Sequence, residues 1–289
     1  MSDSYTPPEI WSPDTKSGGT FAGINRPYAG AREERDLPAS EHPFQLYSLA
    51  TPNGQKVAIM FEELLDAGHE DAEYDAWQVK IGDGEQFWSG FVDLNPNSKI
   101  PALLDRSGPE PLRVFESGAI LLHLAEKFDR FMPSANPARA EVLSWLMWQM
   151  GTAPFIGGGF GHFYNYAPEK LEYPIDRYAM ETKRIYDVAN RRLAESEYLG
   201  GPDYTIADIA TYPWLSSVWH GGYNGADHFL SLHEYEHVGR WIKAIDARHA
   251  VIRGRLVNSA ALPERHSAAD FETVEDRTLF SPVRKRRDA

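Results

Sequence analysis

The sequence contains no cysteine among its 289 residues. A disulfide, a thiolate metal site and a cysteine nucleophile are therefore all excluded. If this protein carries out thiol chemistry, the thiol must come from a bound molecule.

Long apolar runs are also missing. No run of about 18 apolar residues occurs, and residues 1–30 lack an apolar segment of signal-peptide length. We therefore expect a cytoplasmic protein without a membrane segment. Basic side chains are few, with 29 Lys and Arg against 42 Asp and Glu, a net charge of −13. This balance argues against nucleic acid or an anionic membrane as the partner, and the basic run at 284–287 is expected to be a solvated or docking tail.

The composition nevertheless supports real cores, because 42% of the residues are hydrophobic and 12% are aromatic. A chain of this length is long enough for two domains of ordinary size. Residues 1–43 are rich in Pro, Gly, Ser and charge, with Trp11 and Phe21 as isolated anchors. We expect them to form an arm laid over a surface, as arms that cover a partner subunit do.

From residue 44 the pattern changes to regular elements. Strand-like runs and helical periodicity alternate in the order β-α-β-β-β-α, with strands at 44–49, 72–79, 102–104 and 114–115 and helices at 56–67 and 118–128. A linker at 133–137 is followed only by helical patterns, at 139–150, 172–195, 206–219 and 237–247. The predicted fold class is therefore α/β plus all-α.

Two segments of the first half suggest a ligand. Pro101 follows an apolar residue and opens a short apolar run, which is typical of a strand entered through a fixed peptide that can be cis. Residues 113–115 run straight into Glu116 and Ser117, which begin a helix whose first turn offers a carboxylate, a hydroxyl and unpaired N–H groups. Together they resemble the peptide-binding face of a thioredoxin-like domain, and they suggest glutathione.

The chain resembles the glutathione transferase superfamily over roughly residues 44–255. The resemblance rests on four motifs in the right order, which are L-Y-S-L-A-T-P-N-G-Q-K-V at 46–57, N-P-N-S-K-I-P-A-L at 95–103, F-E-S-G-A-I-L at 115–121 and Y-T-I-A-D-I-A at 204–210. More narrowly, T-P-N-G-Q-K, I-G-D-G-E-Q-F, G-G-G-F-G-H-F-Y and the long arm are similar to the nu class of YghU-like bacterial enzymes.

This resemblance implies a homodimer and a division of the chain into four regions. They are an N-terminal extension arm (1–43), a thioredoxin-like glutathione-binding domain with a mixed four-stranded sheet (44–131), an all-helical substrate domain (132–258) and a C-terminal tail (259–289).

Thr51 and Asn53 stand where the first strand meets the first helix, which is the superfamily's position for activating the glutathione sulfur. A free thiol has a pKa of about 8.5, so a hydroxyl and an amide that donate to the thiolate would raise its reactive fraction. The alternative is that Thr51 and Asn53 only form a helix cap or an Asx turn.

Glu116 and Ser117 would bind the γ-glutamyl end of glutathione, with its ammonium on the carboxylate and its carboxylate on the helix N-terminus. Ile100 would pair its backbone with the cysteinyl peptide. The alternative for Glu116 and Ser117 is a simple helix cap.

Further contacts come from the resemblance alone. Members of the nu class hold two glutathione molecules per site, and Lys99, Gln86 and Asn25 are the corresponding polar candidates near the ligand. Arg177 on the helical domain would pair with a carboxylate of the second glutathione, or have a plain surface role.

Tyr166 and Tyr223 are our candidates for the walls of an electrophile pocket. Both stand in segments expected to be Gly-rich loops, where an aromatic ring can offer an apolar face and a phenol donor to an aryl substrate. Each could equally be a simple core residue. Phe155, Phe160 and Trp214 are expected to serve packing.

Three other motifs are assigned no chemistry. Thr205 and Asp208 predict a capping box whose loss would cost about 1–2 kcal/mol and impair folding before activity. The glycine-rich stretch at 157–162 lacks the other residues of a nucleotide-binding loop. The H-E-x-x-H pattern at 233–237 falls at a helix start rather than on a mid-helix face, so we expect no metal.

The sequence thus predicts a glutathione-dependent enzyme whose bound thiolate reduces disulfides or attacks other electrophiles. An alternative with the same parts is a glutathione lyase or β-etherase that cleaves β-aryl ethers of lignin-type aromatics. An alternative of another class is a non-catalytic glutathione-binding scaffold.

Overall fold

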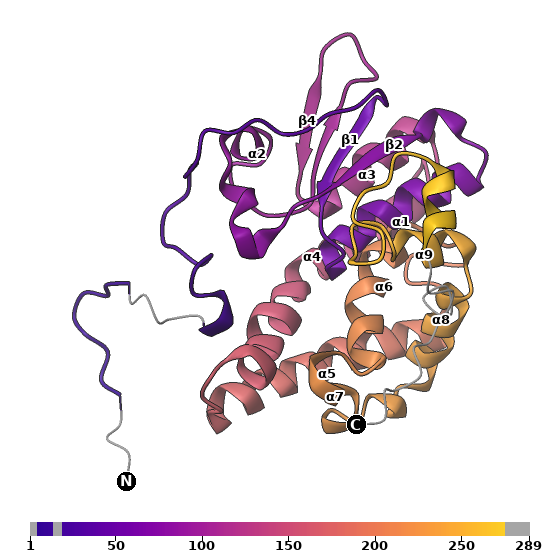
Figure 1. The fold of residues 1–289 in the computed structure, drawn as a ribbon. Helices are drawn as coiled ribbons and strands as arrows, with labels where there is room; N and C mark the ends of the chain where they lie inside the picture. Colours follow the sequence, from indigo (N-terminus) through magenta and orange to yellow (C-terminus); the bar gives the residue numbers. More distant parts are fainter. Residues whose placement is uncertain (1–4, 14–18, 275–289) are drawn as a thin grey trace.

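A mixed four-stranded sheet organises the first half of the chain in the computed structural model, which describes residues 5–13 and 19–274. Its strand order is β2-β1-β3-β4 (Figure 1). The elements are β1 (Phe44–Ser48), α1 (Pro52–Asp66), β2 (Tyr74–Gln78), α2 (Ser89–Leu94), β3 (Ala102–Asp105), β4 (Leu112–Phe115) and α3 (Ser117–Phe128). Short 3-10 turns lie between them: η2 (Glu70–Ala72), η3 (Ile81–Asp83) and η4 (Glu85–Phe87).

The central strand explains why the sheet is mixed. Every residue of β1 is buried, and β1 pairs parallel with β2 and antiparallel with β3. The crossover from β1 to the parallel β2 needs a helix, which α1 supplies, whereas β3 and β4 need only a short connection. This arrangement confirms the predicted thioredoxin-like sheet.

Helices cover both faces of this sheet (Figure 1). The apolar run from Val57 to Phe61 of α1 is buried, and α1 packs against α3 between the sheet and the helical half. A smaller cluster around Tyr47 and Phe91 fills the opposite face beneath α2. The start of α1 differs from the prediction, because the helix begins at Pro52, where a proline fits the first turn.

The second half of the chain is helical, as predicted. It comprises α4 (Ala138–Pro154), the π-helix η5 (Phe155–Tyr166), α5 (Glu172–Glu195), α6 (Ile206–Trp219), α7 (Gly222–Phe229), the turn η6 (Leu232–Glu234), α8 (Glu236–Asp246) and α9 (His249–Gly254). The helix α9 returns to the first half and packs on α1, where Gly254 lies too close to Ile59 for any side chain.

The Gly-rich segment at Tyr166 is helical in the structure, so the loop expected there was wrong, whereas left-handed backbone at residues 223–225 interrupts α7 around Tyr223. Tyr166 ends η5, and Tyr223 lies in α7 at a kink, with φ 52°. Two glycines of η5, Gly159 and Gly161, are needed for packing, because they lie directly against the rings of Tyr178 and Tyr223.

Asp208 forms the predicted capping box with Thr205 at the start of α6. Its carboxylate also accepts bonds from the backbone N–H of Leu199 and the indole N–H of Trp241, both at 2.9 Å. The H-E-x-x-H pattern spans η6 and the first turn of α8, as predicted from the sequence. Within residues 5–13 and 19–274, no group of three potential ligands could hold a metal, and no helix could cross a membrane.

The described part of the C-terminal tail, residues 259–274, packs on the first domain through a few buried side chains. Arg265 pairs with Ala76 as an extra strand partner on β2, and its buried guanidinium contacts Glu62 and Glu73. The turn η7 (Ala268–Thr273) then buries Phe271. The expected tail is therefore part of the first domain's core up to residue 274, and the basic run at 284–287 lies outside the described residues.

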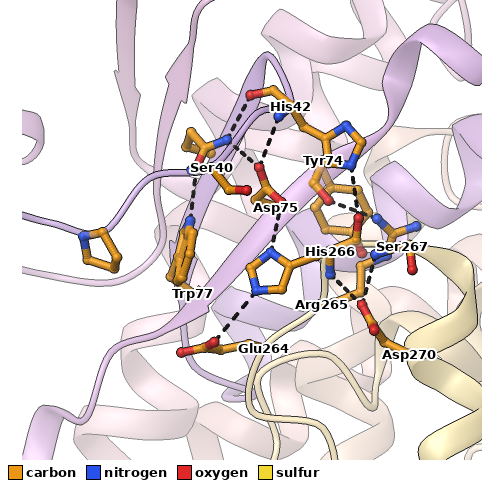
Figure 2. A network of polar contacts seen from close by, with 12 residues as sticks. Ser40, His42, Tyr74, Asp75, Trp77, Glu264, Arg265, His266, Ser267 and Asp270 are labelled. Carbon is orange, nitrogen blue, oxygen red and sulfur yellow. Dashed lines mark hydrogen bonds and ion pairs between the residues drawn. The ribbon is translucent and has the colours of Figure 1, made fainter.

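Polar contacts tie this C-terminal segment to the end of the arm (Figure 2). Asp75 of β2 accepts from the ring of His266 at 2.8 Å and from the backbone N–H of His42 at 3.2 Å. The ring of His42 in turn lies 2.9 Å from the backbone oxygen of His266. The edge strand β2 is thus contacted by the end of the arm at His42 and by the C-terminal segment at Arg265, which protects it from pairing with other chains.

The second half of the arm, from Phe21 onward, also contacts the rest of the chain. Glu33 forms a bridge with Trp88, and Arg32 and Arg35 stack over the rings of Phe87 and Trp88. Phe21, at the end of η1 (Gly19–Phe21), is an anchor as expected, because it packs on Tyr166. Trp11 is not an anchor within this chain, since its side chain is 62% exposed.

Candidate functional site

A cavity of about 310 Å³ opens where the starts of α1 and α3 meet the loop before β3. It is lined by Ile24, Asn53, Ile81, Gln86, Asn95, Asn97, Ser98, Lys99, Ile100, Pro101, Glu116 and Ser117. Seven of the residues predicted from sequence converge here: Asn53, Gln86, Lys99, Ile100, Glu116 and Ser117 on the wall, with Thr51 next to Asn53 at the cap of α1.

The sheet register brings the two diagnostic segments together. Ala102 is the partner of Phe115 in the antiparallel pair of β3 and β4. The residues just before Ala102 and just after Phe115 must therefore lie side by side, and they are Pro101 and Glu116. The Ile100–Pro101 peptide is cis, as the sequence suggested.

The loop that leads into this peptide is fixed by hydrogen bonds to the side chain of Asn95. The side chain of Asn95 donates to the backbone oxygen of Lys99 at 2.6 Å and accepts from the backbone N–H of Asn97 at 2.9 Å. Ser98 between them has φ 53°, a left-handed conformation that is unusual for a residue with a side chain. The loop is thus fixed with Ile100 lining the cavity.

The start of α3 places a carboxylate beside unpaired backbone N–H groups. Glu116 has φ 69°, and such strained backbone at a ligand site is typical of functional positions. Its exposed carboxylate stands before a 12-residue helix whose first N–H groups have no intrahelical partner. Ser117 is buried, and its hydroxyl lies 3.3 Å from the ammonium of Lys56.

Thr51 occupies the N-cap position of α1, but its side chain makes no capping hydrogen bond. A plain cap therefore does not account for this hydroxyl. Asn53 lines the cavity, and its side-chain oxygen accepts a hydrogen bond from the indole N–H of Trp214 at 2.8 Å. This role of Trp214 was missed, because the sequence assigned the residue to packing only.

Two buried polar atoms in the cavity wall have no partner among the described residues. They are the side-chain oxygen of Gln86 and the hydroxyl of Ser98, each in a residue only 4% exposed. Neither atom is accessible to solvent, so both are enclosed by the protein rather than facing the cavity. Ser98 was missed from the sequence, although it belongs to the same S-K-I-P motif as Lys99.

A second cavity of about 340 Å³ adjoins the first and shares Ile24, Asn97, Ser98 and Lys99 with it. Asn25 lies here, together with Arg26, Arg32 and Tyr28 of the arm. The guanidinium groups give this cavity a cationic wall, which suits a carboxylate.

Tyr166 and Tyr223 contact each other edge to face, with ring centroids 5.8 Å apart. Burial raises the pKa of Tyr223 far above its ordinary value, and Tyr166 adds to this effect. Tyr223 therefore remains a protonated phenol, and Gly157 lies between the Trp214 ring and the Tyr223 hydroxyl, since a side chain there would meet both.

Tyr166 and Tyr223 line neither of these cavities. Arg177 also lies away from both cavities within one chain. It lies on α5 in a separate surface hollow with Tyr173 and Met180, 3.7 Å from Glu181. Its assignment to a second glutathione stays a prediction.

Lys56 was missed as a site residue. Its fully buried ammonium lies directly beneath Ser117, 2.7 Å from the side-chain oxygen of Gln149. Burial lowers the pKa of Lys56 to about 7, although Glu116 acts in the opposite direction. The signal in the sequence was a lysine directly before the apolar run that forms the buried face of α1.

Comparisons with known proteins agree with this geometry. Residues 43–126 match the glutathione S-transferase N-terminal domain, and residues 172–244 match the C-terminal domain. The disulfide-bond oxidoreductase YghU of Escherichia coli is 54% identical over 282 residues, which cover 95% of this chain and 98% of that protein.

Solved structures of glutathione transferases are also similar to this chain. The glutathione transferase YghU of Streptococcus pneumoniae, solved with glutathione, is 55% identical, with a TM-score of 0.87 over 89% of this chain and 99% of that one. A relative from Pseudomonas fluorescens with two glutathione molecules bound is 40% identical, with a TM-score of 0.70 over 75% of this chain and 95% of its own. The chain therefore belongs to the glutathione S-transferase family and is a YghU-like member of it.

Proposed function

We propose that this protein binds glutathione in the cavity formed by Asn53, Ile100 and Glu116, and uses its thiolate to reduce disulfides. The observation that carries the proposal is the juxtaposition of a backbone edge at cis-Pro101, a carboxylate with an open helix start at Glu116 and Ser117, and an amide at Asn53. These three features match the peptide backbone, the γ-glutamyl end and the sulfur of glutathione.

The chain has no cysteine, so glutathione supplies both thiols of the reaction. One glutathione thiolate attacks a sulfur of the substrate disulfide and expels the first substrate thiolate, which takes up a proton. A second glutathione thiolate then attacks the glutathione sulfur of the mixed disulfide and expels the other substrate thiolate. Two glutathione molecules are oxidised to glutathione disulfide, and one substrate disulfide is reduced to two thiols.

The second cavity supports this stoichiometry. It lies beside the first, and its wall of Asn25, Arg26 and Arg32 would bind the carboxylates of a second glutathione. The P. fluorescens relative has two glutathione molecules bound, and the E. coli relative is a disulfide-bond oxidoreductase. Holding both thiols close together is the main contribution expected from the protein.

A carbon electrophile is the second candidate substrate. The pair of Tyr166 and Tyr223 offers two aromatic rings and two phenol hydroxyls, which could donate to the oxygen that leaves when thiolate attacks a β-aryl ether. In that reaction the thiolate forms a carbon–sulfur bond, the ether bond breaks, and the phenolate takes up a proton.

We further propose a cytoplasmic homodimer. The exposed Ile10 and Trp11 of the arm, and Tyr173 and Met180 beside Arg177 on α5, are apolar surfaces that a second copy could cover. Arg177 could then reach a ligand of the partner subunit.

Turnover tests these proposals. Purified protein with glutathione should reduce 2-hydroxyethyl disulfide, and cleavage of a model β-aryl ether would identify the carbon electrophile as well. Glutathione binding by calorimetry without turnover of any disulfide, peroxide or ether would instead favour the non-catalytic scaffold. The stoichiometry from the same titration distinguishes one bound glutathione from two.

A further inference from the structure

We infer that Trp214 is a positioning residue for the sulfur site: its indole holds the side-chain oxygen of Asn53, so that the amide nitrogen is presented to glutathione. The inference rests on the proposed function. The two residues are 161 positions apart, on α6 of the helical domain and α1 of the thioredoxin-like domain.

The chemistry of the pair fixes the direction of this contact. An indole nitrogen can only donate a hydrogen bond, so the Asn53 atom that faces it must be the amide oxygen. The amide nitrogen, which carries two donors, is then the group that remains for the cavity that Asn53 lines. Turned the other way, Asn53 would present its oxygen to a thiolate and repel it.

The indole itself is held by a glycine of η5. A side chain at Gly157 would place its first carbon 2.6 Å from Cη2 and 2.8 Å from Cζ3 of the Trp214 ring, well inside van der Waals contact. The next residue, Gly158, faces open space, with no atom within 4 Å of such a carbon. The indole can therefore occupy its position only because residue 157 has no side chain, whereas a side chain at residue 158 would not contact the indole.

Other charged groups at the cavity are left unchanged by substitutions at 214 and 157. Lys99 and Glu116 line the same cavity, and Lys56 lies beneath Ser117. These groups affect a bound thiolate equally in all variants. A difference in the thiol pKa between variants therefore reports on the orientation of Asn53.

Two variants disturb the contact by independent routes. Trp214→Phe removes the N–H and keeps an aromatic ring, and Gly157→Ala displaces the indole by steric contact. With bound glutathione, we expect both to raise the pKa of its thiol by about one unit, measured by thiolate absorbance against pH. We also expect kcat at neutral pH to fall about tenfold with little change in the KM for glutathione.

The matched controls are Trp219→Phe on the same helix and Gly158→Ala in the same π-helix, and neither should alter the thiol pKa. Folding of each variant is checked by thermal unfolding and glutathione affinity by calorimetry. An unchanged thiol pKa in folded, glutathione-bound Trp214→Phe and Gly157→Ala would overturn the inference. Lack of glutathione binding by the unmodified protein would overturn the proposed function instead, so the two failures are distinguishable.

Discussion

The ammonium of Lys56 lies 2.7 Å from the side-chain oxygen of Gln149, in a fully buried contact between α1 and α4. It joins the two domains directly beneath Ser117, which lies 3.3 Å from the same nitrogen. A charge in such a place is costly unless it is paired, and burial lowers the pKa of Lys56 to about 7.

This burial predicts a pH dependence of stability. Below pH 7, Lys56 is protonated in both the folded and the unfolded state. Between about pH 7 and its ordinary value of 10.5, the unfolded state binds a proton that the folded state lacks, so the free energy of unfolding rises with pH. The contribution approaches about 1.4 kcal/mol per pH unit.

Lys56→Met should remove this pH dependence of the free energy of unfolding, measured in denaturant titrations between pH 7 and 10. Lys243→Met, on the exposed face of α8, should leave it unchanged. An unaltered slope in Lys56→Met would contradict this prediction.

The double variant Thr51→Ala with Asn53→Ala tests the sulfur site as a whole. We expect turnover with glutathione to fall by at least about tenfold, because both donors to the thiolate are lost. Glutathione should still bind, through Ile100, Glu116 and Ser117. Steady-state kinetics together with calorimetry measure both effects, and unchanged turnover would place the activating group elsewhere.

Replacing Asp208 with alanine should affect folding before activity. The sequence predicted a cost of about 1–2 kcal/mol for a lost cap, and the structure raises this to about 3 kcal/mol, because the buried N–H groups of Leu199 and Trp241 also lose their acceptor. Urea unfolding measures the change, with the exposed Asp187→Ala as the control. A variant that keeps its stability but loses turnover would show that Asp208 has a chemical role.

Arg265 tests whether the C-terminal segment belongs to the core. Arg265→Ala removes a guanidinium that is 0% exposed and leaves Glu73 and the backbone oxygen of Tyr74 without their buried partner. We expect a loss of about 3 kcal/mol, typical of breaking a buried ion pair from one side. Arg191→Ala, whose side chain is 79% exposed in a helical pair with Asp187, should cost under about 0.5 kcal/mol in the same urea titration. Equal effects would mean that the segment is only loosely attached.

The sequence predicted the sheet and its ligand segments well, because their signals are local. Ile100 and Pro101 stand together in the chain, as do Glu116 and Ser117, and each pair carries its own backbone chemistry. The segment 155–166 was predicted as a loop because glycines usually break helices. In the fold these glycines instead make room for the rings of Trp214, Tyr178 and Tyr223, a requirement that no local pattern reveals.

The residues missed at the site depend on contacts between distant parts of the chain. Trp214 meets Asn53 only when the two domains pack together, and aromatic residues in apolar helices are ordinarily core. Arg265 comes from a polar segment that periodicity assigns to solvent, yet it is buried by partners about 190 and 200 residues earlier.

The arm crosses from α2 to Tyr166, so it bridges both domains, and its Ile24 contributes to both cavities. The mouth of the sulfur site is therefore formed partly by the arm. We expect a disulfide embedded in a folded protein to be reduced more slowly than a small disulfide, because the arm would have to move aside for it. Comparing the two substrates with and without the arm residues measures this difference.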